Sequence, residues 1–363
     1  MNQVNINLGR RSYKILIGRG LLERCGEYLS HLFSGRKTLL VTNPKVNHLY
    51  GGVIIKSLQE FGFKVTVAEV PDGEEYKSLQ QAERLYDTAF SAGLDRHCPV
   101  LALGGGVIGD LAGFVASTYM RGVGFVQVPT TLLAQVDSSV GGKVAVNHPR
   151  GKNIIGAFYQ PSIVLSDTDT LPSLEDREVR SGISEVIKYG IIGDAQFFSW
   201  LEENIESLLE LTPGAVANAI MQSCLNKSRV VEADETEQGT RAVLNLGHTV
   251  GHALEAITEY KIYRHGEAVA VGMVAAARLA EELSILETEQ RKKIEAILIR
   301  AGLPTKIPQQ TNMDSFINMM YKDKKVTSGD LVFILPENIG SVRIYKNPTE
   351  NSLINILDGM KGR

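Results

Sequence analysis

The stretch Val100-Leu-Ala-Leu-Gly-Gly-Gly-Val-Ile-Gly-Asp-Leu-Ala-Gly113 joins an apolar run to a glycine turn and then to a helical pattern. Its glycines have the Gly-x-Gly-x-x-Gly spacing, which places backbone N–H groups and a helix N-terminus where a pyrophosphate binds. A tight strand-to-helix turn needs glycine as well, so the motif alone does not decide between these interpretations. It also differs from the usual dinucleotide fingerprint, because it follows an internal strand and no acidic residue ends the next strand, residues 125–129.

Short apolar runs rich in branched residues flank this stretch on both sides. They lie at residues 38–42, 64–70, 100–103, 124–128 and 163–166. Helical periodicity separates them, and the repetition of strand, helix and strand predicts a parallel sheet with helices on both faces. At the N-terminus, two alternating segments on either side of Gly9 and Arg10 predict a β-hairpin at an edge of that sheet.

The character of the sequence changes after the turn at Leu171-Pro172-Ser173. Long helical patterns follow at residues 197–211, 214–231, 267–283 and 289–301. Residues 330–336 and 340–345 then form a predicted hairpin. The sequence therefore predicts an α/β domain at residues 1–172 and a mainly α-helical domain at residues 173–363.

Composition excludes several classes of protein. The 363 residues carry 38 Lys and Arg against 41 Asp and Glu, a net charge of −3, so there is no general electrostatic reason to bind nucleic acid or an anionic membrane. The three cysteines, Cys25, Cys98 and Cys224, are odd in number and far apart, which indicates buried residues in a reducing compartment. The N-terminus lacks the apolar core of a signal peptide, and no run reaches the roughly 18 apolar residues of a membrane span, so we expect a cytoplasmic protein.

Further candidates for the ligand of the glycine turn follow other predicted strands. Asn43 comes after the first central strand, Asp72-Gly-Glu-Glu-Tyr-Lys77 after the second, and Thr130-Thr131 after the fourth. Each alone is more often a turn or a helix cap. Their shared position, at the carboxyl ends of strands where open α/β sheets bind ligands, favours a common binding site.

Three of the seven histidines, His248, His252 and His265, lie close together in the sequence. The first two belong to the run Asn245-Leu-Gly-His-Thr-Val-Gly-His-Ala-Leu-Glu255. In a continuous helix, Arg241, Asn245, His248, His252 and Glu255 would share one face. Solvated faces usually consist of Lys and Glu, so a stripe rich in histidine suggests close packing around a ligand. Two histidines four residues apart can bind one metal ion, but Thr249 stands where a zinc peptidase has glutamate.

A carboxylate and a further imidazole complete a possible metal site. Glu185 and Lys188 lie three residues apart in an apolar stretch, where an intrahelical ion pair is the simpler explanation, and His265 opens another helix. One carboxylate with two imidazoles and an open position is the composition of a catalytic zinc site. Zinc or a similar divalent ion is therefore a candidate ligand.

Cationic side chains form a third group. They are Lys143, Lys152 with Asn153, Lys188, Lys227, Arg241 and the run Asp323-Lys324-Lys325. Any one of them is more often an ordinary surface residue. In a chain of net charge −3, lysines beside glycine turns suggest a phosphate or carboxylate pocket.

Six segments together resemble the 3-dehydroquinate synthase family, the sugar phosphate cyclases of the shikimate pathway. They read PDGEEYKS, LGGGVIGDLAGFVASTYMRG, VPTTLLAQVDSSVGGKVAVNHPRGKNIIGAFYQP, SGISEVIKYG, NLGHTVGHALE and YRHGEAVAVGM. The resemblance implies a Rossmann-like NAD-binding α/β domain with a parallel sheet, followed by a helical domain, in a dehydroquinate synthase-like fold. It also implies NAD, a divalent ion (zinc or cobalt), a sugar phosphate substrate and a homodimer, with no nucleic-acid or membrane partner.

The resemblance also assigns residues to roles. The family's metal ligands fall on Glu185, His248 and His265. Its NAD contacts, with the glycine turn and Asn43 added from the strand ends, fall on Asn43, Asp72, Gly73, Glu74, Glu75, Tyr76, Lys77, Gly104, Gly105, Gly106, Val107, Ile108, Gly109, Asp110, Thr130, Thr131, Asp137, Lys143, Lys152, Thr170, Leu171, Pro172 and Ser173. Its substrate groups fall on Lys143, Asn153, Lys188, Lys227, Arg241, Asn245, His252 and Lys324, with Arg121 resembling a residue lent by the neighbouring subunit.

The activity that the resemblance implies is the cyclisation of 3-deoxy-D-arabino-heptulosonate 7-phosphate to 3-dehydroquinate, with loss of phosphate. NAD-dependent oxidation, phosphate elimination, reduction and an intramolecular aldol step follow one another, so NAD is not consumed. A metal-dependent polyol or alcohol dehydrogenase, a related cyclase and an inactive NAD-binding module are the alternatives. The cationic group argues against a simple alcohol substrate.

Overall fold

A mostly parallel sheet forms the centre of the first part of the chain. Its strands are β1 (Asn2–Ile6), β2 (Tyr13–Gly18), β3 (Lys37–Thr42), β4 (Lys64–Glu69), β5 (Val100–Gly104), β6 (Phe125–Pro129) and β9 (Ile163–Asp167), in the order β1-β2-β9-β6-β5-β3-β4. β1 and β2 form an antiparallel hairpin at the edge, and every other neighbouring pair is parallel. The predicted edge hairpin and parallel sheet are confirmed.

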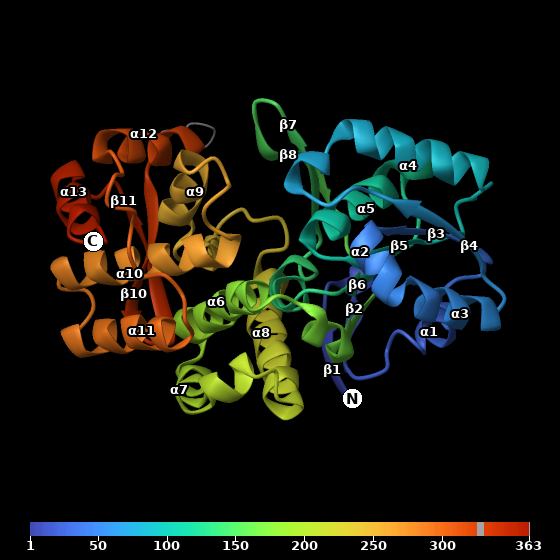
Figure 1. Ribbon diagram of the computed structural model, residues 1–363, viewed down its shortest axis with the longest axis horizontal. Helices are drawn as coiled ribbons and strands as arrows, with labels where there is room; N and C mark the ends of the chain where they lie inside the picture. The colour runs from blue at the N-terminus through green and yellow to red at the C-terminus, as the bar shows by residue number, and fades with distance from the viewer. Residues whose placement is uncertain (325–329, 363) are drawn as a thin grey trace. The chain divides into compact units, whose positions relative to one another are not determined.

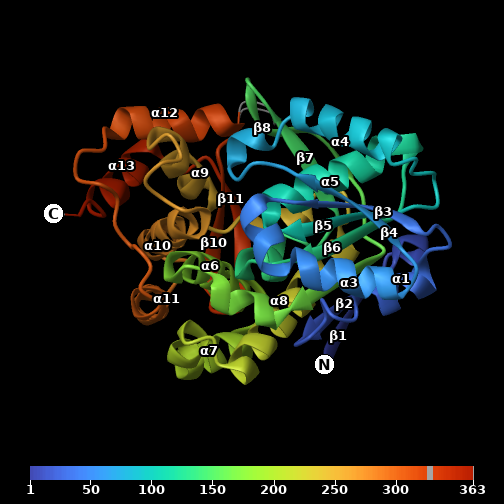
Figure 2. The same cartoon turned by 45° about the vertical axis from the view of Figure 1, so that its right-hand side comes forward.

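Helices cover both faces of this sheet, as Figure 2 shows. On one face α1 (Cys25–Leu32) and α3 (Gly52–Glu60) pack over the leucines and valines of the central strands. On the other face lie α4 (Leu79–Ser91) and α5 (Gly106–Thr118), together with the hairpin of β7 (Lys143–His148) and β8 (Gly151–Phe158). Strands buried on both faces read as continuous apolar runs, which is why their sequence signal was strong.

Short helical turns connect these elements. They are η1 (Gly9–Arg11), α2 (Pro44–Val46), η2 (Asn47–Gly51), η3 (Glu74–Tyr76), η4 (Tyr119–Arg121), η5 (Ala134–Ser138) and η6 (Thr168–Ser173). Three of them, α2, η3 and η6, follow the carboxyl ends of the strands β3, β4 and β9.

Helices dominate the second part of the chain (Figure 1). They are α6 (Asp176–Gly193), α7 (Ala195–Leu209), α8 (Pro213–Ala233), the 3₁₀ helix η7 (Thr240–Asn245), α9 (His248–Ile257), α10 (His265–Glu282), α11 (Thr288–Arg300), α12 (Met313–Lys324) and α13 (Glu350–Asp358). The hairpin of β10 (Val332–Asn338) and β11 (Ser341–Lys346) packs against α10 and α6. An α/β sheet domain followed by a helical domain is the fold that the sequence predicted.

The computed structural model describes residues 1–324 and 330–362, and of 322–324 the backbone only. The chain divides into two units, Met1–Ser173 with Val216–Thr236, and Leu174–Ala215 with Glu237–Arg363. Most of α8 thus belongs to the first unit, although it lies beyond residue 172 in the sequence. Hydrogen bonds hold it there, such as the one from the backbone N–H of Asn7 to Glu232 Oε1. Among the described residues, no helix combines the length and the apolar character that crossing a membrane requires.

Candidate active site

Helix α6 carries a buried carboxylate beside a buried ammonium group. Glu185 and Lys188 are 0% and 1% exposed, one turn apart, and Lys188 Nζ forms an ion pair with Oε2 of Glu185. The other carboxylate oxygen, Oε1, accepts no hydrogen bond from any of the described residues. A buried carboxylate oxygen without a donor is costly, so this atom is positioned for a cationic ligand.

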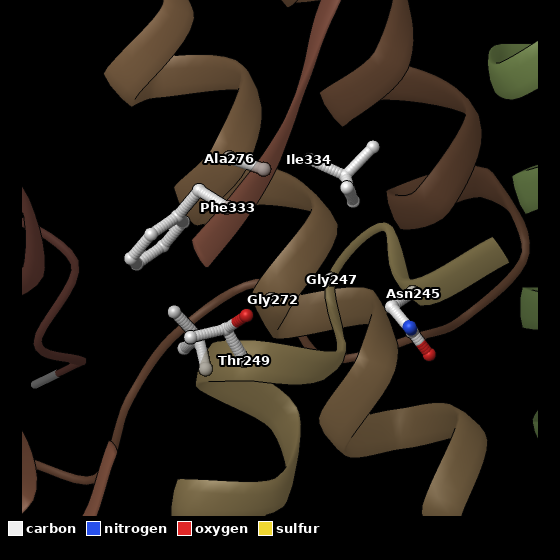
Figure 3. Close-up of a pocket in the computed structure, with 8 residues that line it drawn as sticks. Asn245, Gly247, Thr249, Gly272, Ala276, Phe333 and Ile334 are labelled. Carbon is white, nitrogen blue, oxygen red and sulfur yellow. The ribbon is translucent and has the colours of Figure 1, made fainter. Parts of the chain in front are cut away.

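Two glycines place His248 at the start of α9. Gly247 adopts a left-handed conformation, with φ of 80°, and a Cβ at this position would lie 2.6 Å from the carbonyl oxygen of Val269 on α10. A Cβ at Gly272 would lie 1.8 Å from the carbonyl oxygen of Gly247. Figure 3 shows Gly247 and Gly272 side by side in a small pocket that Thr249 and Phe333 also line. The start of α9 therefore rests backbone to backbone on α10.

This turn also interrupts the expected helix. Arg241 and Asn245 lie in η7, and α9 begins only at His248, so the polar stripe does not run along one continuous helix face. His248, His252 and Glu255 do share α9 at positions i, i+4 and i+7.

His265 is fixed at the N-terminus of α10 by contacts with α6. The next residue, Gly266, donates its N–H to Ser181 Oγ at 3.0 Å, and a Cβ there would lie 1.9 Å from the Ser181 carbonyl oxygen. Glu267 accepts from the backbone N–H of Arg264 at 2.8 Å and binds Arg177 of α6 through two hydrogen bonds of 2.6 Å. The helix that carries Glu185 thus also positions His265.

Glu185, His248 and His265 come together in this unit, each offering a ligand atom within 4.8 Å of the others. Oε1 of Glu185 lies 3.8 Å from Nε2 of His265, and the ring centroids of His248 and His265 are 5.4 Å apart. A second group, made of His252, Glu255 and His265, meets the same 4.8 Å limit. Within the part of the chain that the structure describes, two possible donor sets therefore share His265.

Electrostatics keep His248 in the form that a metal requires. Burial lowers its pKa well below the usual value, and the neighbouring Lys188 lowers it further. Its Nδ1 lies 3.1 Å from the carbonyl oxygen of Leu246 and so donates to it. The lone pair of the neutral ring is then on Nε2.

Two further predicted substrate residues lie in η7. Arg241 is 1% exposed, which is unusual for a guanidinium group and suits the capture of an anion, and Asn245 is partly buried. The Lys324 side chain lies outside the described residues.

In the first unit, most of the predicted cofactor residues lie at one edge of the sheet, whereas Asp137 lies in η5 and Lys143 and Lys152 lie in the separate β7–β8 hairpin. Asn43 follows β3, residues 72–77 follow β4, the glycine turn follows β5, Thr130 and Thr131 follow β6, and residues 170–173 follow β9. Because β3, β4, β5, β6 and β9 run parallel, their carboxyl ends meet at that edge. Strand order reverses between β3 and β5, which is where open α/β sheets bind ligands.

The glycine turn leads directly into α5, as expected from the motif. Gly105 is the N-cap residue and has no side chain to cap α5, so the first amides of this helix receive no capping bond from it. A Cβ on Gly105 would lie 3.2 Å from Cγ2 of Thr131, and one on Gly106 would lie 3.2 Å from Oγ of Ser138. The turn is thus both a helix N-terminus and a close packing contact. None of Gly104, Gly105, Gly106 and Gly109 has a positive φ, so close approach rather than left-handed backbone accounts for these glycines, and pyrophosphate binding stays a prediction.

Lys77 binds two other predicted site residues. Its Nζ lies 2.5 Å from Oδ2 of Asp110 on α5 and 2.6 Å from Oδ1 of Asn153 on β8. Burial raises the pKa of Asp110, and the charge of Lys77 opposes that shift. Asn153 has a left-handed backbone, with φ of 55°, at a position where the structure presents its amide to Lys77.

A second buried lysine comes from α8. Lys227 Nζ binds the carbonyl oxygen and Oδ1 of Asp137, each at 2.7 Å, which explains why Val216–Thr236 belongs to the first unit. Lys143 and Lys152 are exposed, and Lys152 lies 4.0 Å from Glu74.

Several residues that position the site were not predicted from the sequence. Asn147 on β7 hydrogen-bonds the side chain of Glu74 at 2.8 Å and the backbone N–H of Asn153 at 3.0 Å. Ser181 and Arg177 hold the α10 N-terminus, as described above. Only Glu267 had a sequence signal, because a glutamate three residues after a helix N-cap is typical of a capping box.

Comparison with known proteins assigns the family. Residues 67–181 match the family model described as 3-dehydroquinate synthase N-terminal, and residues 182–326 match 3-dehydroquinate synthase C-terminal. A 3-dehydroquinate synthase of Pelotomaculum thermopropionicum is 56% identical, over 100% of this chain and 98% of the relative. One from Desulforamulus reducens is 53% identical, over 98% and 99%.

Solved structures of related cyclases share the fold. A 2-deoxy-scyllo-inosose synthase, crystallised with carbaglucose-6-phosphate, NAD⁺ and Co²⁺, superposes with a TM-score of 0.90 at 27% identity, covering 99% of this chain and 100% of that one. A 2-epi-5-epi-valiolone synthase from Streptomyces hygroscopicus with NAD⁺ and Zn²⁺ bound gives 0.88 at 26%, covering 96% of each chain. The chain therefore belongs to the 3-dehydroquinate synthase family and is an enzyme with that family's activity, a carbon–oxygen lyase.

Proposed function

We propose that this chain performs the synthase reaction with NAD⁺ at the carboxyl edge of its sheet and a divalent ion held by Glu185, His248 and His265. The observation that carries the metal site is Oε1 of Glu185, a buried carboxylate oxygen without a hydrogen-bond donor among the described residues. Two imidazoles stand beside it, and at least one of them, His248, is neutral. One carboxylate and two neutral imidazoles suit Zn²⁺ or Co²⁺ and leave a coordination position for substrate.

The second candidate donor set, His252 with Glu255 and His265, is less suitable for the resident ion. Its carboxylate already lies 3.4 Å from Nδ1 of His265, within reach of a ring N–H, and the Oε1 atom of Glu185 would stay without a partner. We therefore assign His252 to the substrate, beside the ion, with its ring centroid 5.3 Å from that of His248.

For NAD⁺, the chain offers an uncapped helix N-terminus after an internal strand, with acidic and hydroxyl side chains around it. Anions bind to such termini because the first amides lack partners and the helix dipole favours negative charge. The structural relatives that hold NAD⁺ share the fold over nearly the whole chain. The residues of this edge thus fit a dinucleotide.

When bound, NAD⁺ and the ion supply a recyclable hydride acceptor and a Lewis acid for the substrate hydroxyls. The protein's own residues bind and orient the sugar phosphate. Arg241, a buried guanidinium, suits bidentate capture of the carboxylate, and Lys188 and Asn245 contact the hydroxyl groups. Lys227, whose Nζ is bound to Oδ1 of Asp137, is the remaining lysine that we assign to substrate binding.

The phosphate of the substrate needs a cationic pocket of its own. We assign it to Lys143, Asn153, His252 and Lys324, together with Arg121 from a second subunit of a homodimer. Because the leaving phosphate is itself a base within the substrate, we assign no side chain as general base.

One assay separates this reaction from the alternative of a net dehydrogenase. Purified protein is incubated with 3-deoxy-D-arabino-heptulosonate 7-phosphate, a divalent ion and substoichiometric NAD⁺, and phosphate and NADH are followed together. We expect many phosphates released per NAD⁺ with no accumulation of NADH, because the hydride is returned within each cycle. Stoichiometric NADH from a plain alcohol, without phosphate release, would assign the protein to the dehydrogenases instead.

A further inference from the structure

Glu255 has no role in the reaction proposed above, yet it lies beside the proposed metal site. It ends the histidine face of α9, seven residues after His248, and is 8% exposed. Charged side chains are seldom so buried unless a partner compensates for the loss of water. Its Oε1 lies 3.4 Å from Nδ1 of His265.

His265 faces a different carboxylate with each ring nitrogen. Nε2 is 3.8 Å from Oε1 of Glu185, and Nδ1 is 3.4 Å from Oε1 of Glu255. A neutral imidazole has one N–H donor and one lone pair, so it presents a lone pair at only one of the two nitrogens. A carboxylate at Nδ1 fixes the proton there and leaves the lone pair on Nε2, toward Glu185.

The alternative is a second ion held by His252, Glu255 and His265. Filling both donor sets at once would require His265 to give a lone pair from each nitrogen, which means losing both ring protons. A single ion with a hydrogen-bonded outer carboxylate needs no such step, and metal-bound histidines usually donate their other N–H to a carboxylate, carbonyl or water. The single-ion arrangement is therefore favoured.

We propose that Glu255 is a positioning residue that accepts a hydrogen bond from Nδ1–H of His265 and so aims Nε2 at the metal. The proposal rests on the metal site assigned above. Its consequence is that Glu255 sets metal affinity without being a ligand, since loss of an outer partner typically weakens binding by about 10- to 100-fold.

Metal affinity, rather than activity, tests this role. The full-length protein and its variants are stripped of metal, and the Zn²⁺ dissociation constant is measured by competition with a chelating dye, with ions per chain and melting temperature alongside. Glu255→Ala removes the acceptor, and Glu255→Gln keeps an acceptor oxygen without the charge. Glu281→Ala is the matched control, since Glu281 lies on the same helix as His265 and its carboxylate binds Arg291 at 2.8 Å.

We expect one Zn²⁺ per chain throughout, a dissociation constant raised about 10- to 100-fold in Glu255→Ala, a smaller change in Glu255→Gln, and none in Glu281→Ala. If Glu255→Ala does not fold, Glu255→Leu replaces it, because leucine fills the space without an acceptor. An unchanged dissociation constant in the variant that folds overturns the proposal. So does a fall from two ions to one, which would make Glu255 a ligand of a second ion.

A parallel Glu185→Ala variant separates this proposal from the assignment of the metal site itself. Loss of Zn²⁺ in Glu185→Ala together with weakened binding in Glu255→Ala supports both. Zn²⁺ retained at full affinity in Glu185→Ala but lost in Glu255→Ala would refute the triad and make Glu255 a ligand.

Discussion

The two histidines of α9 differ in role although they lie one turn apart. His248 is within 4.8 Å of Glu185 and His265 through their ligand atoms, whereas His252 belongs to the group that contains Glu255. Both rings are partly buried, and their centroids are 5.3 Å apart. Position along the helix, rather than residue type, thus separates a proposed ligand from a proposed substrate contact.

The metal content of single-residue variants should distinguish the proposed ligands from the proposed substrate contact. We expect Glu185→Ala, His248→Ala and His265→Ala each to lose the bound ion, because three protein ligands hold it and two leave an incomplete shell. His252→Ala should keep one ion per chain while its turnover falls about 10- to 100-fold, which corresponds to the roughly 1.5–3 kcal/mol of one hydrogen bond to a charged group. Elemental analysis and steady-state kinetics measure the two quantities.

The four variants also test the assignment against its exchange. If His252→Ala loses the ion and His265→Ala keeps it, ligand and substrate contact have been assigned the wrong way round. Full occupancy in two of the three proposed ligand variants would refute the triad altogether.

At the level of elements, glycines decide how the helices of the site meet. Gly266 allows the first turn of α10 to approach α6, and Gly272 allows the middle of α10 to approach the turn before α9. Both contacts are between backbones, so a methyl group cannot be accommodated by moving a flexible side chain. The three helices that carry the proposed ligands are therefore held in register by two positions without side chains.

Gly266→Ala should disturb stability and metal binding together. Its Cβ would lie 1.9 Å from the carbonyl oxygen of Ser181, so α10 must shift, and we expect a loss of about 1–3 kcal/mol of unfolding free energy. The shift moves His265, so the Zn²⁺ dissociation constant should rise as well. Thermal unfolding and the chelator competition measure these effects.

Gly214→Ala is the matched control for this substitution. It lies in the first turn of α8, where a Cβ meets nothing within 4 Å, so we expect unchanged or slightly higher stability and unchanged metal affinity. Equal melting temperatures and equal affinities for Gly266→Ala and the parent protein would contradict the proposed role of this contact.

These glycine contacts also show which features of the site could not be predicted from the sequence. Periodicity located the strands of the seven-stranded sheet, the β10–β11 hairpin and most of the helices, because the side-chain pattern of a buried element is local, but it did not locate β7 and β8. It did not locate the break before His248, since Leu246 and Gly247 fit an amphipathic helix equally well. The break depends on contact with α10, about 25 residues further along, and no local pattern reports such a contact.

At the level of the whole molecule, the placement of α8 likewise depends on contacts between residues far apart in the sequence, which no local pattern reports. The composition changes near residue 172, but residues 216–236 return to the first unit through Lys227 with Asp137 and Glu232 with Asn7. Neither pair is visible in the sequence, because the partners lie about 90 and 225 residues apart. The family resemblance, in contrast, identified candidate residues directly, and their roles stay predictions until tested.

Arg121 is the predicted site residue whose role depends on assembly. It ends η4 after α5, and three consecutive residues there, Met120, Arg121 and Gly122, have φ of 48°, 66° and 115°. Left-handed backbone is uncommon at non-glycine residues and costs free energy. The side chain is exposed and makes no ion pair within the described part of the chain, so it is available to a second subunit.

A mixing experiment tests whether Arg121 completes the phosphate pocket of a partner. Arg121→Ala and His248→Ala should each be inactive, one for want of a phosphate contact and the other for want of a metal ligand. In a mixed dimer, the site with an intact His248 receives the intact Arg121 of its neighbour, and the other site carries both lesions. We therefore expect about half of the sites in mixed dimers to regain activity after subunit exchange. If exchange is verified with differently tagged subunits and activity does not return, Arg121 acts within its own chain or has no part in the reaction.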